Sequence, residues 1–538
     1  MKSLIKLVLL FTLLSSTLGV IASEHFHQVL VDSRANVIPI PATGTKAITL
    51  KQPRHGQAIL IGDIVRYTPD PGYVGEDRFS TRTVDGEITI YSIEVTKHRT
   101  EIAQGKASSP SVDDSEQPNI VLIFTDDAGY IDYGFQPGAD PKLTELTPRI
   151  TRLGEEGAVF TNAYVSASVC GPSRAGLLTG RYQQRFGHEM NMPIGYEGGM
   201  PDEEPMISER LNPLGYVSGV VGKWGVAYRY DAWPNQRKWD YSFIHLRGQR
   251  NFWPMRTEPL VSVFIEDNQP TPESGYATDR IGDKSVEFIR NHSDKPFFLF
   301  VPFNAPHGPL QPRPEDSDIV AQFEDEKRGK FAGLVKALDD NVGKILDVLD
   351  EQGLTKDTLV LFINDNGGAE HLGADNGILR GAKASLYEGG IRVAWAMRWP
   401  GRIPAGHTVH APVTALDLLP TFVKMAGGQP ERAWQLDGVD ILPLATGEEK
   451  TLPERDLFWR RGGSNKGHYA VRSSDWKLYI NKQLKNPKWE LYNLDTDIGE
   501  QNDLAEAHPE IVARLQAKLD TWESGLIDPL WNLKSFMD

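Results

Sequence analysis

The spacing of apolar residues changes twice along this 538-residue chain, and the changes divide it into three parts. Between residues 24 and 97, short β-branched runs alternate with Gly, Pro and Asp turns, a pattern typical of a small β-sandwich. The runs start at Ala47, Ala58, Ile64, Arg78 and Ile88. Residues 98–117 have no periodicity, which predicts a linker.

Continuous apolar runs begin after residue 118 and alternate with helical patterns. The runs cover residues 120–124, 217–221, 297–301, 359–363 and 393–397. Uniformly apolar runs of this length are typical of parallel strands that are buried on both faces. The alternation predicts an α/β domain over residues 118–456, with a mostly parallel sheet covered by helices on both faces.

Two helices of this domain can be placed from the sequence. Thr147 and Pro148 have the residue types of an N-cap and a first helical position. The second helix covers residues 330–351, where one apolar stripe contains Phe331, Leu334, Val335, Leu338, Val342, Ile345, Leu346 and Leu349. Asp339 and Asp340 interrupt this stripe, and we expect both at the helix surface.

The third part, residues 457–538, has a different pattern. Aromatic, strand-like runs cover residues 468–472, 476–480 and 489–494, and an amphipathic helix is expected over 509–526. This order predicts a small α+β subdomain with an antiparallel sheet.

The first 22 residues have the composition of a secretory leader. Lys2 and Lys6 precede an apolar run, which ends in small residues at Ala22. The run is too short to span a membrane, and no other stretch is long and apolar enough. We therefore expect a cleaved signal peptide, an exported protein in the periplasm or outside the cell, and no stable membrane span.

The net charge limits the classes of partner. A formal charge of −15 argues against a nucleic-acid partner or a general attraction to anionic membranes. An anionic substrate would therefore have to be held by local basic residues and a cation.

Polar residues follow four of the apolar runs, where ligands bind in parallel α/β sheets. They are Asp126, Asp127, Lys223, His307, Asp365 and Asn366. Any one aspartate alone is more simply a helix cap or turn residue. Two acidic pairs at strand ends, without a cluster of cysteines or histidines, favour a Ca²⁺ site, with Mg²⁺ as the weaker alternative.

Cys170 is the only cysteine, so it cannot form an internal disulfide. Pro172 suits the first position of a helix and Gly180 suits its C-terminal end, which predicts a short helix starting just after Cys170. The free N–H groups at such a helix start attract anions. Without these neighbours, Cys170 would be read as a small buried apolar residue.

Cys-Gly-Pro-Ser-Arg at 170–174 and Thr-Gly-Arg at 179–181 resemble the signature of the type I sulfatases. The resemblance extends from about residue 118 to the C-terminus. It implies an alkaline-phosphatase-like fold and conversion of Cys170 to formylglycine by a maturation enzyme, with the aldehyde hydrate as nucleophile. Separately, residues 67–79 resemble a motif of bacterial immunoglobulin/cadherin-like domains.

The sulfatase resemblance also implies roles for individual residues. Arg174 would orient the formylglycine, Lys223 and Lys383 would bind the sulfate oxygens, and His307 would be the general acid. The calcium ligands would be Asp126, Asp127, Asp365, Asn366 and the formylglycine oxygen at residue 170.

One position departs from the family pattern. Gly225 follows Gly-Lys-Trp where the family commonly has a histidine. His188 is a candidate to replace it as a base, or to bind substrate. Arg247 is a candidate substrate-binding residue, together with Trp224, Tyr228, Arg229, Trp233 and Trp253, although the tryptophans are equally compatible with a hydrophobic core.

These observations predict a secreted sulfatase that acts on a sulfated carbohydrate, such as the marine algal polysaccharides ulvan or carrageenan or their oligosaccharides. Two alternatives remain. One is a phosphate monoester or diester hydrolase of the same superfamily. The other is a non-catalytic glycan-binding protein, with Gly225 as the sign of lost activity.

Overall fold

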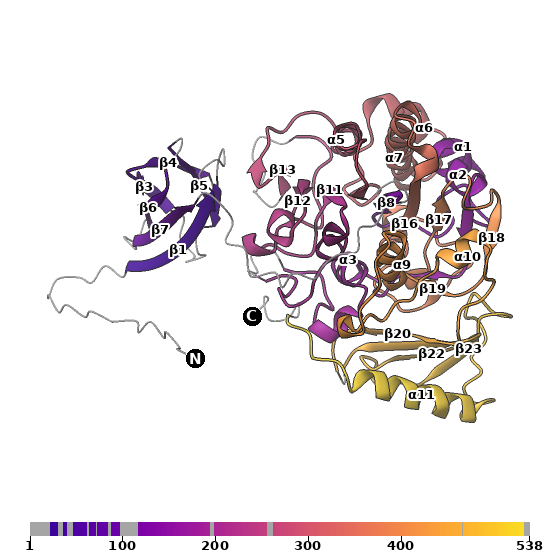
Figure 1. The fold of residues 1–538 in the computed structure, drawn as a ribbon. Coiled ribbons are helices and arrows are strands. Elements are labelled where there is room, and N and C mark those ends of the chain that lie inside the picture. The colour runs from indigo at the N-terminus through magenta and orange to yellow at the C-terminus, as the bar shows by residue number, and fades with distance from the viewer. Residues whose placement is uncertain are drawn as a thin grey trace. The chain divides into compact units, whose positions relative to one another are not determined.

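The computed structural model describes residues 22–30, 36–39, 47–61, 64–70, 73–83, 88–96, 117–193, 198–254, 262–464 and 466–531. The chain forms two compact units, Met1–Lys106 and Ala107–Asp538, and each is described by itself (Figure 1). The predicted leader lies outside the described residues except for Ala22, and the predicted linker except for Gln117.

The first unit contains two sheets. One has the order β1-β7-β6-β3 and the other β2-β5-β4. Their strands are β1 (Ala22–Leu30), β2 (Asn36–Pro39), β3 (Ala47–Lys51), β4 (Gly56–Ile61), β5 (Ile64–Pro69), β6 (Gly75–Thr83) and β7 (Ile88–Thr96). The five predicted runs correspond to β3–β7. Val65 and Tyr67 of one sheet share a buried core with Phe79, Tyr91 and Ile93 of the other. The likeness of this unit to immunoglobulin/cadherin domains stays a prediction.

The second unit is built on a ten-stranded sheet with the order β14-β13-β12-β11-β15-β8-β16-β17-β9-β18. Its strands are β8 (Asn119–Thr125), β9 (Ala158–Phe160), β11 (Val217–Lys223), β12 (Tyr241–His245), β13 (Ile265–Glu266), β14 (Gln269–Pro270), β15 (Phe297–Pro302), β16 (Thr358–Asn364), β17 (Trp395–Arg398) and β18 (His407–Val409). The central strands β12, β11, β15, β8 and β16 are parallel. This confirms the predicted direction of four apolar runs.

The fifth run was predicted wrongly. Residues 393–397 contain most of β17, which pairs antiparallel with β16. The only α-helix between these two strands is α8 (Glu388–Ile391), which has four residues. The connecting segment folds back beside the end of β16, where Gly367 donates to the Gly390 carbonyl and Lys383 to the Gly368 carbonyl, so the chain enters β17 from the edge at which β16 ends.

Helices cover both faces of the sheet. On one face α5 (Ala277–Asn291) and α7 (Glu326–Glu351) pack against residues such as Val121 and Leu299. On the other face lies α9 (Leu418–Met425), where Phe422 contacts Phe298 with ring centroids 5.8 Å apart. Because neighbouring strand residues point to opposite faces, these contacts place α7 and α9 on opposite sides.

The apolar stripe of α7 is buried as predicted, but Asp339 is not a surface charge. Its carboxylate is 1% exposed and accepts a hydrogen bond from the backbone N–H of Ile150, 2.8 Å away. Ile150 lies in the first turn of α2 (Pro148–Glu155). Thr147 holds the N-cap position of α2, but its hydroxyl donates to the Leu143 carbonyl instead. Asp339 therefore accepts a hydrogen bond from one of the free N–H groups at the start of α2, which the Thr147 side chain does not bind.

The C-terminal part forms the predicted antiparallel sheet, ordered β20-β21-β22-β23, with α11 along one face (yellow in Figure 1). The elements are β20 (Asp456–Arg461), β21 (His468–Ser473), β22 (Trp476–Asn481), β23 (Glu490–Asn493) and α11 (Pro509–Glu523). Leu515, Leu519 and Trp522 of α11 are buried against this sheet. No helix among the described residues combines the length and apolar character needed to cross a membrane.

Candidate active site

The carboxyl ends of the central strands bring six predicted residues to one edge of the sheet. Asp126 and Asp127 follow β8, Asp365 and Asn366 follow β16, and Lys223 ends β11. His307 lies five residues beyond the end of β15. All of these except His307 are 2% exposed or less. Charged side chains are rarely buried unless they are paired, and here these residues pair with one another.

Cys170 is the first residue of helix α3 (Cys170–Thr179), so the helix begins two residues before the predicted start at Pro172. Gly180 ends it with a φ of 64°, as its position predicted. The Sγ atom of Cys170 is buried and donates to Asp126 Oδ1 at 3.4 Å. Because α3 packs its whole length into the interior, the position of residue 170 is set by the core.

The neighbouring charges alternate in sign around residue 170. Lys223 Nζ binds Asp126, and Arg174 Nη2 lies 3.0 Å from Asp365 Oδ2 and 3.5 Å from Asp126 Oδ2. Arg174 also donates to the backbone carbonyl of Lys223 at 2.9 Å. These contacts tie α3 to the ends of three strands.

Asp127 collects the second group of contacts. Lys383 Nζ lies 2.6 Å from its Oδ1, His307 Nε2 lies 3.3 Å from its Oδ2, and Asn366 Nδ2 donates to Oδ1 at 2.9 Å. The backbone at Asp127 has a φ of 70°, which is uncommon for a non-glycine residue and is found preferentially at functional sites. Nine predicted residues are thus joined in one network: Asp126, Asp127, Cys170, Arg174, Lys223, His307, Asp365, Asn366 and Lys383.

The charges shift the pKa values of the buried acids in different directions. Burial raises the pKa of Asp126, but the positive charges, Lys223 first, outweigh it and hold the pKa below its usual value. Burial, followed by the charge of Asp126, raises the pKa of Asp365 to about 7. Burial, again followed by Asp126, raises the pKa of the Cys170 thiol to about 12. The unmodified thiol is therefore neutral near pH 7 and is a weak nucleophile.

The donor set fits a hard divalent cation. Asp126, Asp127, Cys170 and His307 each offer a ligand atom, and these atoms lie within 4.8 Å of one another. Asn366 Oδ1 is buried and has no hydrogen-bond partner among the described residues. A buried amide oxygen without a donor, next to three carboxylates, matches the oxygen ligands that calcium takes in proteins.

Gly225 faces this network. A Cβ atom at this position would lie 3.4 Å from Arg174 Cδ and 3.5 Å from Lys223 Cε. The φ of Gly225 is 71°, a conformation that a histidine rarely adopts. The departure from the family motif therefore involves the backbone as well as the missing imidazole.

His188 is fully buried, and neither ring nitrogen has a hydrogen-bond partner among the described residues. Burial lowers its pKa to about 3, so the ring is neutral near pH 7. It contacts the edge of Trp531, and a Cβ on Gly171 would lie 3.4 Å from its Nε2. The ring lies next to the start of α3, but a pKa this low makes it a weak proton acceptor near pH 7 and full burial keeps it from solvent, so the base and substrate-binding hypotheses both stay predictions.

The aromatic and arginine candidates for substrate contact divide into two groups. Trp224 and Trp233 are core residues, 0% and 3% exposed. Arg229 pairs with Asp202 at 2.6 Å. Tyr228 and Arg247 are partly exposed, and Trp253 is 37% exposed.

Asn191 belongs to the surroundings of the nucleophile but was not predicted. Its Oδ1 accepts a hydrogen bond from the backbone N–H of Gly171 at 2.8 Å. It occupies one of the helix N–H groups that we had expected to be free. Asn191 is in an irregular segment without a motif, so only the fold places it there.

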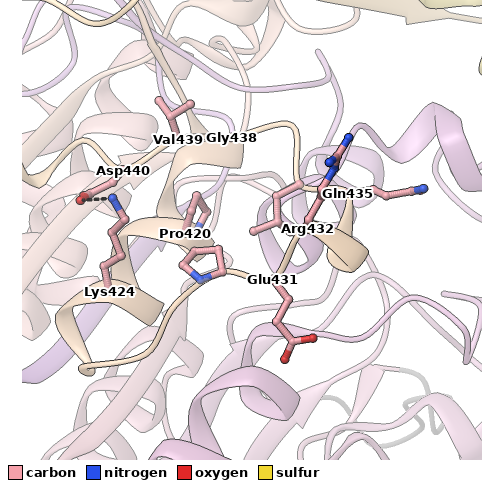
Figure 2. Close-up of a pocket in the computed structure, with 10 residues that line it drawn as sticks. Pro420, Lys424, Glu431, Arg432, Gln435, Gly438, Val439 and Asp440 are labelled. Carbon is pink, nitrogen blue, oxygen red and sulfur yellow. Dashed lines mark ion pairs between the residues drawn. The ribbon is translucent and has the colours of Figure 1, made fainter.

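Figure 2 shows a surface hollow of about 490 Å³ that shares no lining residue with this network. It is lined by residues between Pro420 and Asp440, including Arg432 and a Lys424–Asp440 ion pair. It contains none of the nine residues of the network.

Comparisons with known proteins identify the family. Residues 118–428 match the family model described as Sulfatase, and residues 382–524 match N-sulphoglucosamine sulphohydrolase, C-terminal. The chain is 31% identical to N-acetylgalactosamine-6-sulfatase of Canis lupus familiaris over 412 residues, which cover 70% of this chain and 75% of that one. It is also 31% identical to arylsulfatase A of Homo sapiens over 456 residues, or 74% and 86% of the two chains.

A solved structure has a similar fold and sequence. The structure of Ps i-CgsB in complex with k-i-k-neocarrahexaose matches with a TM-score of 0.74 and 32% sequence identity, covering 78% of this chain and 96% of that one. Sequence motif, strand-end network and comparisons lead to the same conclusion: the chain belongs to the sulfatase family, has the alkaline-phosphatase-like fold, and is a sulfuric ester hydrolase.

Proposed function

We propose that this sulfatase is exported and removes sulfate from a sulfated carbohydrate of the carrageenan type, with formylglycine at residue 170 and Ca²⁺ beside it. The observation that carries the proposal is the buried network of residue 170, in which Lys223, Lys383 and Arg174 pair with the aspartates next to it and the charges of Lys223 and Lys383 act on its side chain. Three cations converging on a nucleophile position suit an anionic sulfuryl group.

Each residue of the network has a defined task in this proposal. Lys223 and Lys383 bind the sulfuryl oxygens, and Arg174 holds the start of α3 against the strand ends. The ring of His307 is oriented by a contact of 2.7 Å between Nδ1 and the Gly308 carbonyl, which directs Nε2 into the site. From there the imidazole can supply a proton to the leaving oxygen, which matters because a sugar alkoxide is a poor leaving group.

Asp126, Asp127, Asp365 and Asn366 are the proposed calcium ligands. Bound Ca²⁺ would neutralise part of the charge on the sulfuryl oxygens and act as a Lewis acid. The unsatisfied Asn366 Oδ1 and the clustered carboxylates of Asp126 and Asp127 support this assignment, and Asp365 accepts from the Asp127 backbone N–H at 3.3 Å.

The substrate class rests on the relatives. The structure of Ps i-CgsB contains a neocarrahexaose. One relative is named N-acetylgalactosamine-6-sulfatase, and another is named arylsulfatase A. The leader-like residues 1–22 support export, which would bring the enzyme to glycans outside the cytoplasm.

The test is the release of inorganic sulfate from carrageenans, ulvan and animal glycosaminoglycans by the full chain, co-expressed with a formylglycine-generating enzyme. We expect release from a carrageenan by the parent and none by Cys170→Ala, because that variant cannot be converted. Treatment with EGTA should abolish release, and Ca²⁺ should restore it better than Mg²⁺.

Two controls make the result decisive. The peptide mass at residue 170 establishes conversion, and an aryl phosphate measured beside an aryl sulfate tests for phosphoesterase activity. Verified conversion without sulfate release from any glycan would refute the proposal. Faster turnover of the phosphate than of the sulfate ester would also count against it.

A further inference from the structure

Arg247 lies at the same edge of the sheet as the sulfate-binding lysine. It follows β12 by two residues, and β12 is the parallel neighbour of β11. Lys223, the last residue of β11, is in register with His245, the last residue of β12. Since neighbouring strands are about 5 Å apart, Arg247 is roughly one strand away from the proposed sulfuryl site.

The backbone at Arg247 is held in place by its surroundings. The Trp224 N–H donates to the His245 carbonyl at 2.9 Å, which joins the two strand ends. The ring of His245 is fully buried, and its Nδ1 contacts the Arg247 carbonyl at 3.0 Å. A turn held in this way fixes the backbone of Arg247, so only its side chain has to be ordered when a ligand binds.

The guanidinium of Arg247 has no hydrogen bond or ion pair among the described residues. Other arginines nearby are neutralised: Arg229 pairs with Asp202 at 2.6 Å, and Arg250 pairs with Glu273 at 2.7 Å. Arg247 is partly exposed, and none of the acidic side chains that the structure describes pairs with it.

Tyr228 lies within the electrostatic reach of both cations. Burial raises the pKa of its phenol, and the positive charges of Arg247 and then Lys223 oppose that rise. Tyr228 is in the loop that follows Lys223, and its side chain is partly exposed. A phenol and a guanidinium that has no partner among the described residues are thus both close to Lys223, and both can donate hydrogen bonds to an anion.

We infer that Arg247, with the Tyr228 hydroxyl, binds a second anionic group of the glycan, about one strand away from the sulfate that is removed. The planar guanidinium can donate two parallel hydrogen bonds to a sulfate or a carboxylate. The preferred substrate is then a sugar with two negative groups close together. This inference rests on the proposed function.

Binding to unconverted protein tests the inference without catalysis. In the Cys170→Ala background, isothermal titration would compare a disaccharide with one sulfate, the same disaccharide with two sulfates, and a monosulfated disaccharide with a uronate. Arg247→Ala should weaken binding of a doubly charged sugar about 10- to 100-fold, the usual range for a lost charge-assisted hydrogen bond. Binding of the singly sulfated sugar should change less than about threefold.

Two further variants serve as controls. Arg247→Lys keeps the positive charge but cannot donate two parallel hydrogen bonds. Its affinity for the doubly charged sugar should therefore lie between those of the parent and Arg247→Ala. Arg432→Ala removes an arginine from the separate hollow in Figure 2 and should leave all three affinities unchanged. The sugar whose affinity depends on Arg247 identifies the second anion as sulfate or carboxylate.

The experiment distinguishes failure of the second anion site from failure of the proposed function. An equal loss for the singly and doubly charged sugars, or no loss for any of them, would overturn the second anion site while sulfate release by the parent still stands. Absence of both sugar binding and sulfate release in the parent would refute the proposed function itself.

Discussion

Asp339 shows how one buried carboxyl can link two helices. It belongs to α7 but supplies the hydrogen-bond acceptor that the start of α2 needs. Periodicity placed it among apolar residues, and the rarity of buried aspartate then led to the wrong prediction of a surface position. The apolar periodicity of α7 cannot show that a backbone N–H at the start of α2, far away in the sequence, will donate to Asp339.

The buried position gives Asp339 a measurable pH dependence. Burial raises its pKa to about 7, above the usual value of an aspartate, so the folded state binds the proton more tightly than the unfolded state does. The contribution of this group to stability is therefore fully present below about pH 4 and is lost as the pH rises towards 7. Asp339→Asn keeps an oxygen acceptor but does not ionise.

We predict that the melting temperature of Asp339→Asn, relative to the parent, rises between pH 4 and pH 8. Thermal unfolding of both proteins across this range measures the difference, in which the titration of all other groups cancels. Asp340→Asn is the matched control, since burial of Asp340 is outweighed by Lys336 and Arg313 and its pKa is lowered instead. A constant difference between parent and Asp339→Asn would contradict the assignment.

Helix α3 connects sequence to site at the scale of one element. Cys170 is at its start and Gly180 at its end, and every residue between them is buried. Gly180 has a φ of 64°, and a Cβ there would lie 3.0 Å from Leu419 Cβ. The glycine is therefore required both by the left-handed turn and by close packing.

Gly180→Ala should lower the free energy of unfolding by more than the roughly 1–2 kcal/mol of the left-handed backbone alone. The control is Gly353→Ala after α7, where φ is 70° and no atom lies within 4 Å of the added Cβ. Denaturant unfolding of the two variants gives the comparison. If both variants lost the same stability, the packing contribution at Gly180 would be absent.

At the scale of the whole second unit, a buried charge cluster joins the large sheet to the C-terminal subdomain. Lys477 Nζ in β22 lies 2.8 Å from Glu388 Oε1 in α8 and 2.8 Å from Glu500 Oε1. The side chains of all three residues are 0% exposed. Helix α8 follows the segment that carries Lys383, so this cluster also supports one wall of the active site.

Lys477→Met should destabilise the protein by about 3–5 kcal/mol, because it removes the cation that the buried Glu500 pairs with, while Glu388 keeps Arg392 at 3.2 Å. Lys518→Met is the matched control, since the Lys518–Asp456 pair is partly exposed and should contribute about 1 kcal/mol or less. Chemical unfolding monitored by tryptophan fluorescence would measure both. A similar, small loss in both variants would show that the cluster does not hold the two parts together.

Much of this protein was readable from its sequence because the signals were local. Uniform apolar runs marked four of the five central parallel strands but not β12, and the polar residues after them marked the site, since parallel strands end at a common edge. The Cys170–Arg174 motif and the acidic pairs at 126–127 and 365–366 needed no long-range information. The antiparallel direction of β17 was missed, because it depends on the path of the chain between two strands.

The partners of buried polar groups were decided only by the tertiary structure. Asn191 at the start of α3, Asp339 at the start of α2 and Lys477 between two carboxylates are far in sequence from the groups they bind. Arg247 is a related case, because the proposal for it depends on its lack of a partner among the described residues, while Arg229 and Arg250 are paired. Apolar burial follows from periodicity along the chain, whereas a hydrogen bond or an ion pair needs two groups at a set distance, and folding alone brings them there.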